Sequence, residues 1–299
     1  MFKNLTVYRV GAQWLPNLKE IEDRLHKERF VPCGTTQPIS MGWVPPRGLA
    51  NAPMIESVDG HHLIKLMVEQ KVVPGSVIKR RTDEIAKKIE DDTGRKPGKK
   101  QTKEIKEQAL LDLLPMAFTK QSSVQIWLAP TLGLLMMDAS SQGKADEIVA
   151  QVVKVMDGLE VRHVQTEQSS AAMMSDWLVS GEPPSNFTVD RELELKSTDE
   201  MKSVVRYSRH ALDTDEVRQH IASGKQPTKL SMTWEGRVSL LLTDTMQLKK
   251  ISFLDGVFEG QAPANKDEAF DADLAIATGE LSQLLPDLIE ALGGELPLS

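Results

Sequence analysis

The sequence predicts an α+β fold with mixed or antiparallel sheets, packed helices and one helical hairpin that projects from the body. Strand and helix patterns follow each other without the regular alternation of parallel α/β folds. Between residues 75 and 118, two helical patterns carry only a thin apolar stripe, which is typical of a hairpin with little surface to bury. A chain of 299 residues is long enough to form more than one core.

The N-terminal part combines short strands with one helix. Leu18, Ile21 and Leu25 recur at helical spacing, and the turn signal Asp59-Gly60 precedes an apolar strand pattern. The expected elements are a strand at 5–10, a helix at 18–25, a strand at 30–32, a loop rich in proline and glycine at 41–48, and a strand at 61–68.

Residues 75–118, here called the finger, read as two helices joined by a short break. Ser76 is a candidate cap of a first helix that ends at Gly94. A second helix runs from about Gln101 to Leu114, and Pro97-Gly98 separates the two.

The C-terminal part contains a meander of three strands. Its expected elements are strands at 134–137, 161–164 and 204–207, helices at 144–156 and 213–221, meander strands at 228–234, 237–243 and 248–254, and a helix at 278–292. Pro286 should kink this last helix or mark the start of a new one. Two segments follow the order strand, helix, strand and then a loop, which contains Trp43 in the first and Trp177 in the second. This order suggests an internal duplication, or a common unit that recurs without shared origin.

Three domains follow from this pattern. The first is a central α+β domain formed by residues 1–74 and 119–165. The finger is the second domain, and a further α+β region spans residues 166–299.

The net charge of −7 conceals a strong separation of charge along the chain. Between Lys79 and Lys106, eleven lysines and arginines accompany six acids, a net charge of +5, so the rest of the chain carries −12. The local field, rather than the net charge, decides whether a polyanion is attracted. Charge alone favours a solvated helix pair here over a nucleic-acid surface.

Other signals predict neither an enzyme nor a membrane protein. The single Cys33 cannot form a disulfide within the chain, which favours a reducing compartment, and we expect it to be a small buried residue. The start lacks a signal peptide, and the most apolar window, 126–137, is too short to span a membrane. No glycine-rich phosphate loop occurs and the histidines are not clustered, so we expect no cofactor and no metal.

Two tryptophans and two aspartates could serve either a structural or a functional role. Trp43 and Trp177 are expected to anchor cores rather than to stack on bases. Asp271 and Asp273 would share one face of a strand, where an acidic solvent edge is favoured over a metal-dependent nuclease centre.

Several segments resemble the recombination-associated RdgC family of bacteria, and together they cover nearly the whole chain. The specific matches are Met41-Gly42-Trp43-Val44-Pro45-Pro46 and, near the C-terminus, Leu288-Ile289-Glu290 with Leu292-Gly293-Gly294-Glu295. Weaker matches are Phe2-Lys3-Asn4-Leu5, Pro32-Cys33-Gly34, Leu113-Leu114-Pro115, Gly224-Lys225 and Phe270-Asp271-Ala272-Asp273.

The resemblance implies a non-enzymatic protein that binds double-stranded DNA with little sequence preference. It implies a homodimer closed into a ring around the DNA, which restrains recombinase-promoted strand exchange. Single-stranded DNA and the recombinase itself are further candidate partners. A cytoplasmic, nucleoid-associated protein without membrane contact is expected.

The resemblance also suggests site residues. Phe118 matches an aromatic residue at the contact that closes the ring, although a core position is the alternative. Arg209-His210 match a Lys-Gln pair implicated in DNA binding, but a histidine is at most partly charged near neutral pH. Gln121 replaces an aromatic residue of a relative.

The candidate DNA contacts are basic residues of the finger and of the C-terminal region. The candidate gate residues, where two fingers would meet, lie at the C-terminal end of the finger. The DNA contacts are Lys79, Arg80, Arg81, Lys87, Lys88, Arg95, Lys96, Lys99, Lys100, Lys103, Arg209, His210, Lys225 and Lys229, and the gate residues are Phe118, Leu114 and Pro115.

Two other functions stay open at this point. The protein could inhibit a recombinase by direct contact through its acidic C-terminal region, where ten acids follow residue 254 with a single lysine. It could also be a nuclease that uses Asp271 and Asp273.

Overall fold

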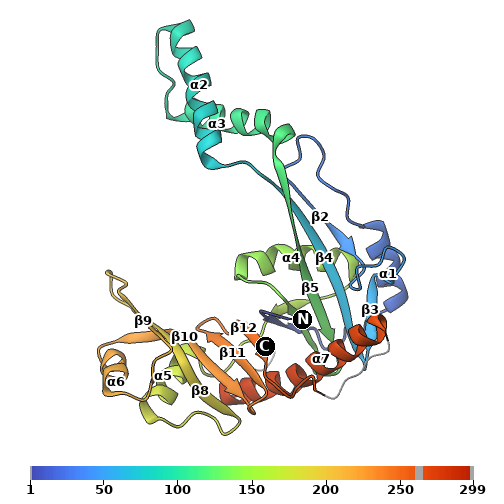
Figure 1. Cartoon of the computed structure of the whole chain (residues 1–299), viewed down its shortest axis with the longest axis vertical. Coiled ribbons are helices and arrows are strands. Elements are labelled where there is room, and N and C mark those ends of the chain that lie inside the picture. Colours follow the sequence, from blue (N-terminus) through green and yellow to red (C-terminus); the bar gives the residue numbers. More distant parts are fainter. Residues whose placement is uncertain (1, 260–264, 297–299) are drawn as a thin grey trace. The chain divides into compact units, whose positions relative to one another are not determined.

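The computed structural model describes residues 2–259 and 265–296 and confirms the α+β class (Figure 1). The described residues form two antiparallel sheets and seven α-helices. The chain divides into two compact units, one of Met1–Glu22, Pro45–Ile64 and Gln125–Ser299, the other of Asp23–Val44 and Lys65–Val124. The predicted finger falls wholly within the second unit, which also takes in residues assigned above to the central domain. Within the described ranges, no helix has both the length and the apolar composition to cross a membrane.

The first sheet has the strand order β2-β4-β5-β6-β1-β7, and β3 pairs with β4. Its strands are β1 (Thr6–Val10), β2 (Ile39–Val44), β3 (Ile55–Val58), β4 (His61–Val72), β5 (Phe118–Ala129), β6 (Leu134–Met137) and β7 (Val161–His163). The predicted turn Asp59-Gly60 joins β3 to β4, and both residues have positive φ, as a tight hairpin turn requires.

The second sheet belongs to the first unit and has the order β12-β11-β10-β8-β9. Its strands are β8 (Phe187–Ser197), β9 (Val204–Ser208), β10 (Lys225–Trp234), β11 (Val238–Thr243) and β12 (Leu248–Phe253). The helices of this unit are α4 (Gln142–Val155), α5 (Ser170–Ser180), α6 (Asp215–Ala222) and α7 (Lys266–Ala291), and α7 runs along the sheet in Figure 1.

A single apolar core connects both sheets of the first unit with α7. Trp127 from β5, Leu230 from β10 and Leu281 from α7 belong to it, and all three are fully buried. The N-terminal segment also joins β12, because Leu5 and Leu248 exchange backbone hydrogen bonds of 2.7 and 3.0 Å.

The second unit combines the finger with β2 and the parts of β4 and β5 next to the finger. The finger consists of α2 (Gly75–Thr93), α3 (Lys99–Leu113) and a 3₁₀ turn at Leu114–Met116. Helix α1 (Leu18–Lys27) contributes residues to both units. Gly94 ends α2 in the left-handed conformation, as predicted, but Pro74 occupies the N-cap and Ser76 does not cap the helix.

Several local predictions were wrong. Residues 30–32 form no strand, and the residue before them, Arg29, forms an isolated bridge with Trp43. The predicted loop at 41–48 contains most of β2, and the second predicted tryptophan loop is helix α5. The two tryptophans thus lie in different types of element, although both are buried, at 2% and 3% exposure, as predicted for core anchors.

The C-terminal helix is longer than the sequence suggested. It begins at Lys266, so Asp271 and Asp273 lie on a helix and do not share the face that a strand would give them. The helix is unbroken through Pro286, because neighbouring leucines such as Leu284, Leu285 and Leu288 are fully buried and hold it in place. Strands β3, β5 and β8 were not predicted.

Gly42 shows why the segment Met41–Pro46 needs a glycine. The backbone amides of Phe30 and Trp43 bond to Trp43 and Glu28 carbonyls at 2.9 and 3.0 Å, which brings residues 28–30 onto β2. A Cβ on Gly42 would lie 2.4 Å from the Phe30 Cα atom. Only a residue without a side chain allows this approach of two backbones.

We therefore expect Gly42→Ala to lower the free energy of unfolding by about 1–3 kcal/mol through overpacking. Gly279→Ala is the matched control, because no atom lies within 4 Å of a Cβ at this helical position. The control should be neutral or stabilising by up to about 1 kcal/mol. Urea unfolding followed by circular dichroism measures both, and equal stability of Gly42→Ala and wild type would contradict the steric argument.

Candidate nucleic-acid interface

The finger has a small core of its own. Thr82 of α2 and Ile105 and Ala109 of α3 are buried, while most of the remaining residues are exposed. Such a thin contact between two helices leaves their outer faces to solvent. The charged side chains of the finger therefore lie on the exposed faces of α2 and α3 and on the connection between these helices.

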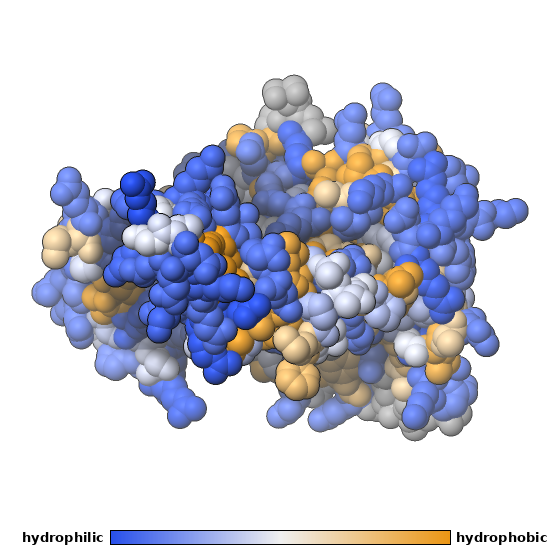
Figure 2. All heavy atoms as spheres, turned by 90° about the horizontal axis from the view of Figure 1, so that it is seen from above, coloured by the Kyte–Doolittle hydropathy of each residue, from blue (hydrophilic) through white to orange (hydrophobic). Residues whose placement is uncertain are grey.

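All eleven lysines and arginines between Lys79 and Lys106 are exposed. Figure 2 shows strongly hydrophilic side chains gathered on the face turned toward the viewer. Only Arg80, Arg81 and Lys96 form ion pairs within the described structure. The other eight have no ion pair there, and they are Lys79, Lys87, Lys88, Arg95, Lys99, Lys100, Lys103 and Lys106.

Three of these free cations form a stripe on α3. Lys99, Lys103 and Lys106 are spaced four and three residues apart, which places them on one side of the helix. Lys106 was not among the predicted contacts, although the same spacing rule applied to the sequence would have included it. A row of uncompensated ammonium groups is suited to contact successive phosphates.

Arg81 differs from these lysines because its side chain forms ion pairs within the finger. Its guanidinium group lies 3.2 Å from Asp112 and 3.4 Å from Glu84, so it joins α2 to α3. Hydrogen bonds to Asp112 and Glu84 raise the pKa of Arg81. This predicted DNA contact therefore holds the two helices together, and its charge is already balanced.

The predicted gate residues differ in their exposure. Phe118 is 86% exposed and Met116 is 75% exposed, so Phe118 is not a core residue of its own chain. Leu114 is buried at 1% exposure, whereas Pro115 is exposed. Two exposed apolar side chains two residues apart form an apolar surface at the end of the finger.

A buried polar network fixes the base of the finger. The Lys71 ammonium group donates a hydrogen bond of 3.0 Å to the Leu114 carbonyl and another to the Thr35 carbonyl. The buried Glu69 carboxylate accepts 2.7 Å bonds from the Gln121 side chain and the Cys33 amide. The Gln121 bond, followed by the Cys33 amide, lowers the pKa of Glu69.

Cys33 itself is partly buried, and it is a poor candidate for a nucleophile. Burial, together with the charge of Glu69, raises the pKa of the Cys33 thiol. A raised pKa leaves little thiolate at neutral pH.

A second basic region lies at the end of β9, in the first unit. Arg209 has a positive φ of 55°, and His210 donates its backbone amide to the Arg191 carbonyl at 3.2 Å. The His210 ring lies 5.5 Å from the Tyr207 ring. Both predicted residues are exposed, and Arg191, which the sequence analysis missed, adjoins them.

The two predicted lysines of β10 are engaged with protein groups. Lys229 forms a 3.0 Å ion pair with Glu194, and the Lys225 ammonium group lies 3.3 Å from the His220 ring. Burial would raise the pKa of Glu194, but hydrogen bonds from Arg206, Lys229 and Thr228 outweigh it and lower the pKa to about 2. The charge of Lys229 is therefore compensated within the protein.

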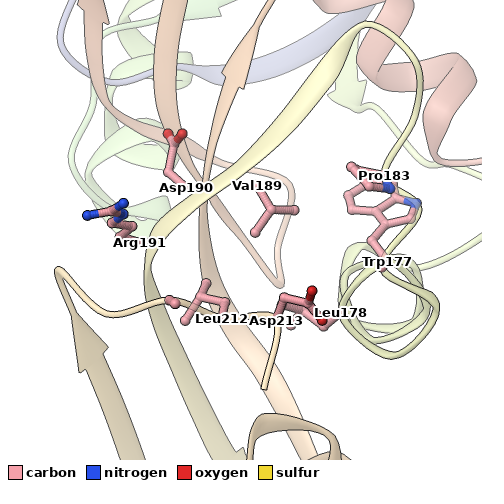
Figure 3. A pocket seen from close by; sticks show the side chains of 10 residues that line it. Trp177, Leu178, Pro183, Val189, Asp190, Arg191, Leu212 and Asp213 are labelled. Carbon is pink, nitrogen blue, oxygen red and sulfur yellow. The ribbon is translucent and has the colours of Figure 1, made fainter. Parts of the chain in front are cut away.

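A cavity of about 270 Å³ opens beside this region (Figure 3). Trp177, Val189 and Leu212 line it, and the charged side chains of Asp190 and Arg191 lie at its other side. Because Trp177 is almost fully buried, its ring is not a platform for an unpaired base.

The carboxylate pair considered for a nuclease has other contacts. Asp271 lies 2.5 Å from Arg47, which also pairs with Glu56 at 2.8 Å and sits over the Phe270 ring. Among residues 2–259 and 265–296, no group of three or more histidine, cysteine or acidic side chains is arranged to hold a metal ion.

Comparison with known proteins gives one consistent result. A family model described as "RdgC: Putative exonuclease, RdgC" matches residues 1–295. The protein named "Recombination-associated protein RdgC" of Dechloromonas aromatica is 41% identical over 300 residues, which cover 99% of this chain and 98% of the relative. The protein of the same name from Cupriavidus necator is 43% identical over 297 residues, covering 98% of each chain.

The hydrogen bonds of Glu194 make the stability of the fold depend on pH. Because its pKa is about 2 in the folded protein and about 4.5 without these contacts, the carboxylate stabilises the fold above pH 4.5. This contribution is lost as the pH falls from 4.5 toward 2. We expect Glu194→Gln to be less stable than wild type at pH 6, with a difference that shrinks at pH 3 in urea unfolding.

Glu182→Gln is the control, since Glu182 is exposed and its carboxylate forms no ion pair in the described structure. It should behave like wild type at both values of pH. A Glu194→Gln difference that stays constant with pH would contradict the assigned ionisation.

Proposed function

This chain belongs to the RdgC family, and we propose that it is a non-enzymatic protein that binds double-stranded DNA without sequence preference. Its relatives carry the name recombination-associated protein, and a role in recombination is the natural setting for such binding. We propose further that two copies close into a ring around the duplex and limit the access of a recombinase to it. Association with the nucleoid follows from this proposal.

The observation that carries the proposal is the set of free cations on the finger. Eight of its eleven cationic side chains have no ion pair in the described structure, and all are exposed. Lysine and arginine bind phosphates and release the counterions that surround DNA, which gives affinity without reading the bases. Flexible lysines on a helix surface suit this role better than a fixed recognition pattern.

The remainder of the chain supports an arrangement in which DNA meets only selected surfaces. Outside the segment from Lys79 to Lys106 the net charge is −12, so an arbitrary surface of the protein would repel DNA. A ring can turn its cationic groups toward the duplex and its acidic groups away from it. The exposed Phe118 ring is a suitable anchor for a contact between two fingers.

Binding without cleavage is part of the proposal. The acids considered for a nuclease do not share a face, and Asp271 is engaged by Arg47. Intact labelled duplex after incubation with magnesium is the expected result. Release of nucleotides under these conditions would instead support the activity that the family description mentions.

The lysine stripe of α3 provides the first test. The triple variant Lys99→Gln, Lys103→Gln, Lys106→Gln should weaken duplex binding and reduce the slope of log affinity against log salt. The expected reduction is about 0.9 for each lost phosphate contact. Fluorescence anisotropy with a labelled duplex, titrated at several salt concentrations, measures the slope.

A triple variant with the same loss of charge is the control, made at the exposed residues Lys19, Lys27 and Lys154 outside the finger. Its slope should equal that of wild type. Equal slopes for both triple variants would show that the finger does not contact the phosphates.

The second test concerns ring closure. Because Phe118 is 86% exposed, Phe118→Ala should leave thermal unfolding of the chain unchanged. At high salt, wild type should stay bound to covalently closed circular DNA and slide off linear DNA. Phe118→Ala should dissociate from both kinds of DNA. Met201→Ala, which alters a side chain of similar exposure in the other unit, should behave like wild type. Equal release of wild type from circles and linear DNA would contradict encirclement.

A further inference from the structure

Five arginines lie in or beside the second sheet, and they fall into two groups. Three form ion pairs: Arg206 with Glu194, Arg218 with Asp213, and Arg237 with Glu280. The other two, Arg191 and Arg209, form no ion pair within residues 2–259 and 265–296, and both are exposed. Two of these five arginines thus have no carboxylate partner in the described structure.

The two uncompensated arginines are neighbours on adjacent strands. Glu192 of β8 lies opposite Ser208, the last residue of β9, so Arg191 lies beside the residues that follow β9. The His210 amide donates to the Arg191 carbonyl at 3.2 Å and joins the two strands at this level. Arg191 and Arg209 are therefore close in the backbone, although they lie 18 residues apart in the sequence.

Each of the two arginines lies at a backbone irregularity. One residue separates Leu230 from Met232 on β10, whereas three residues separate their partners Val189 and Leu193 on β8. Arg191 is the middle residue of this bulge, and bulges redirect side chains at functional positions. Arg209 has a φ of 55°, which is unfavourable for a residue with a side chain. Such local strain is a common property of binding sites.

The acids that could neutralise the pair are engaged by other groups. Asp190 accepts a 2.9 Å hydrogen bond from the Thr233 hydroxyl, and Glu192 lies 2.6 Å from Lys250. Asp213, at the nearby cavity, pairs with Arg218. In Figure 3 the Arg191 side chain points away from Trp177 and the apolar side of that cavity. The two guanidinium groups are therefore open to an external anion.

We propose that Arg191 is a DNA contact residue and that it binds one backbone phosphate together with Arg209. This inference rests on the proposed DNA-binding function. A phosphate that both guanidinium groups reach would accept charge-assisted hydrogen bonds from each of them. The bulge in β8 would then orient Arg191 toward the phosphate that Arg209 binds.

The test is duplex binding by Arg191→Gln, Arg209→Gln and the double variant, with a labelled 30-base-pair duplex. Each single variant should reduce the salt slope by about 0.9, so that raising salt from 50 to 200 mM costs about 3.5-fold less affinity than in wild type. Because one phosphate is shared, the double variant should lose much less than the sum of the two single losses. Arg191→Lys, which keeps the charge, should retain most of the slope.

Arg206→Gln is the matched control. Arg206 lies on β9, three residues before Arg209, and its charge is compensated by Glu194. Its slope should equal that of wild type, and circular dichroism should show that all variants are folded, because these side chains are exposed. If wild type and the lysine stripe variant show DNA binding through the finger while Arg191→Gln retains the full slope, this inference is wrong and the proposed function stands. If wild type does not bind duplex DNA, the proposed function itself fails.

Discussion

Competition for a limited number of positive charges governs the surface of this protein. The chain has 43 acidic and 36 cationic side chains, so a lysine or arginine stays uncompensated only where the fold keeps carboxylates out of reach. Lys229 is not available to bind a phosphate, because its ammonium group lies 3.0 Å from the Glu194 carboxylate. Lys103 on α3 has no carboxylate partner in the described structure. Polyanion binding depends on this local outcome more than on the total charge.

Elements whose ends depend on local chemistry could be predicted from the sequence. Gly94 and the Asp59-Gly60 turn adopt the left-handed conformations that their residue types tolerate. Elements that depend on distant packing were missed. The bulge in β8 interrupts its alternation, and β2 carries a glycine because residues 28–30 lie against it, so both sequences resembled loops.

The candidate site divides in the same way. The basic segment is evident in the sequence, but the balance of each charge depends on partners far along the chain, such as Asp112 for Arg81, 31 residues away. The exposure of Phe118 likewise depends on the turn and strand that surround it. Arg191 has no sequence signal, because only the pairing of β8 with β9 brings it next to the residues that follow β9.

The bond between Glu69 and Gln121 has an evolutionary consequence. A buried carboxylate needs hydrogen-bond donors, and the Gln121 amide supplies one at 2.7 Å. A homologue with an aromatic residue at position 121 would leave an acid at position 69 without this donor. The two positions should therefore covary across the family, with an acid at 69 accompanying a donor at 121, and the pair would mark lineages that stabilise the base of the finger through polar contacts.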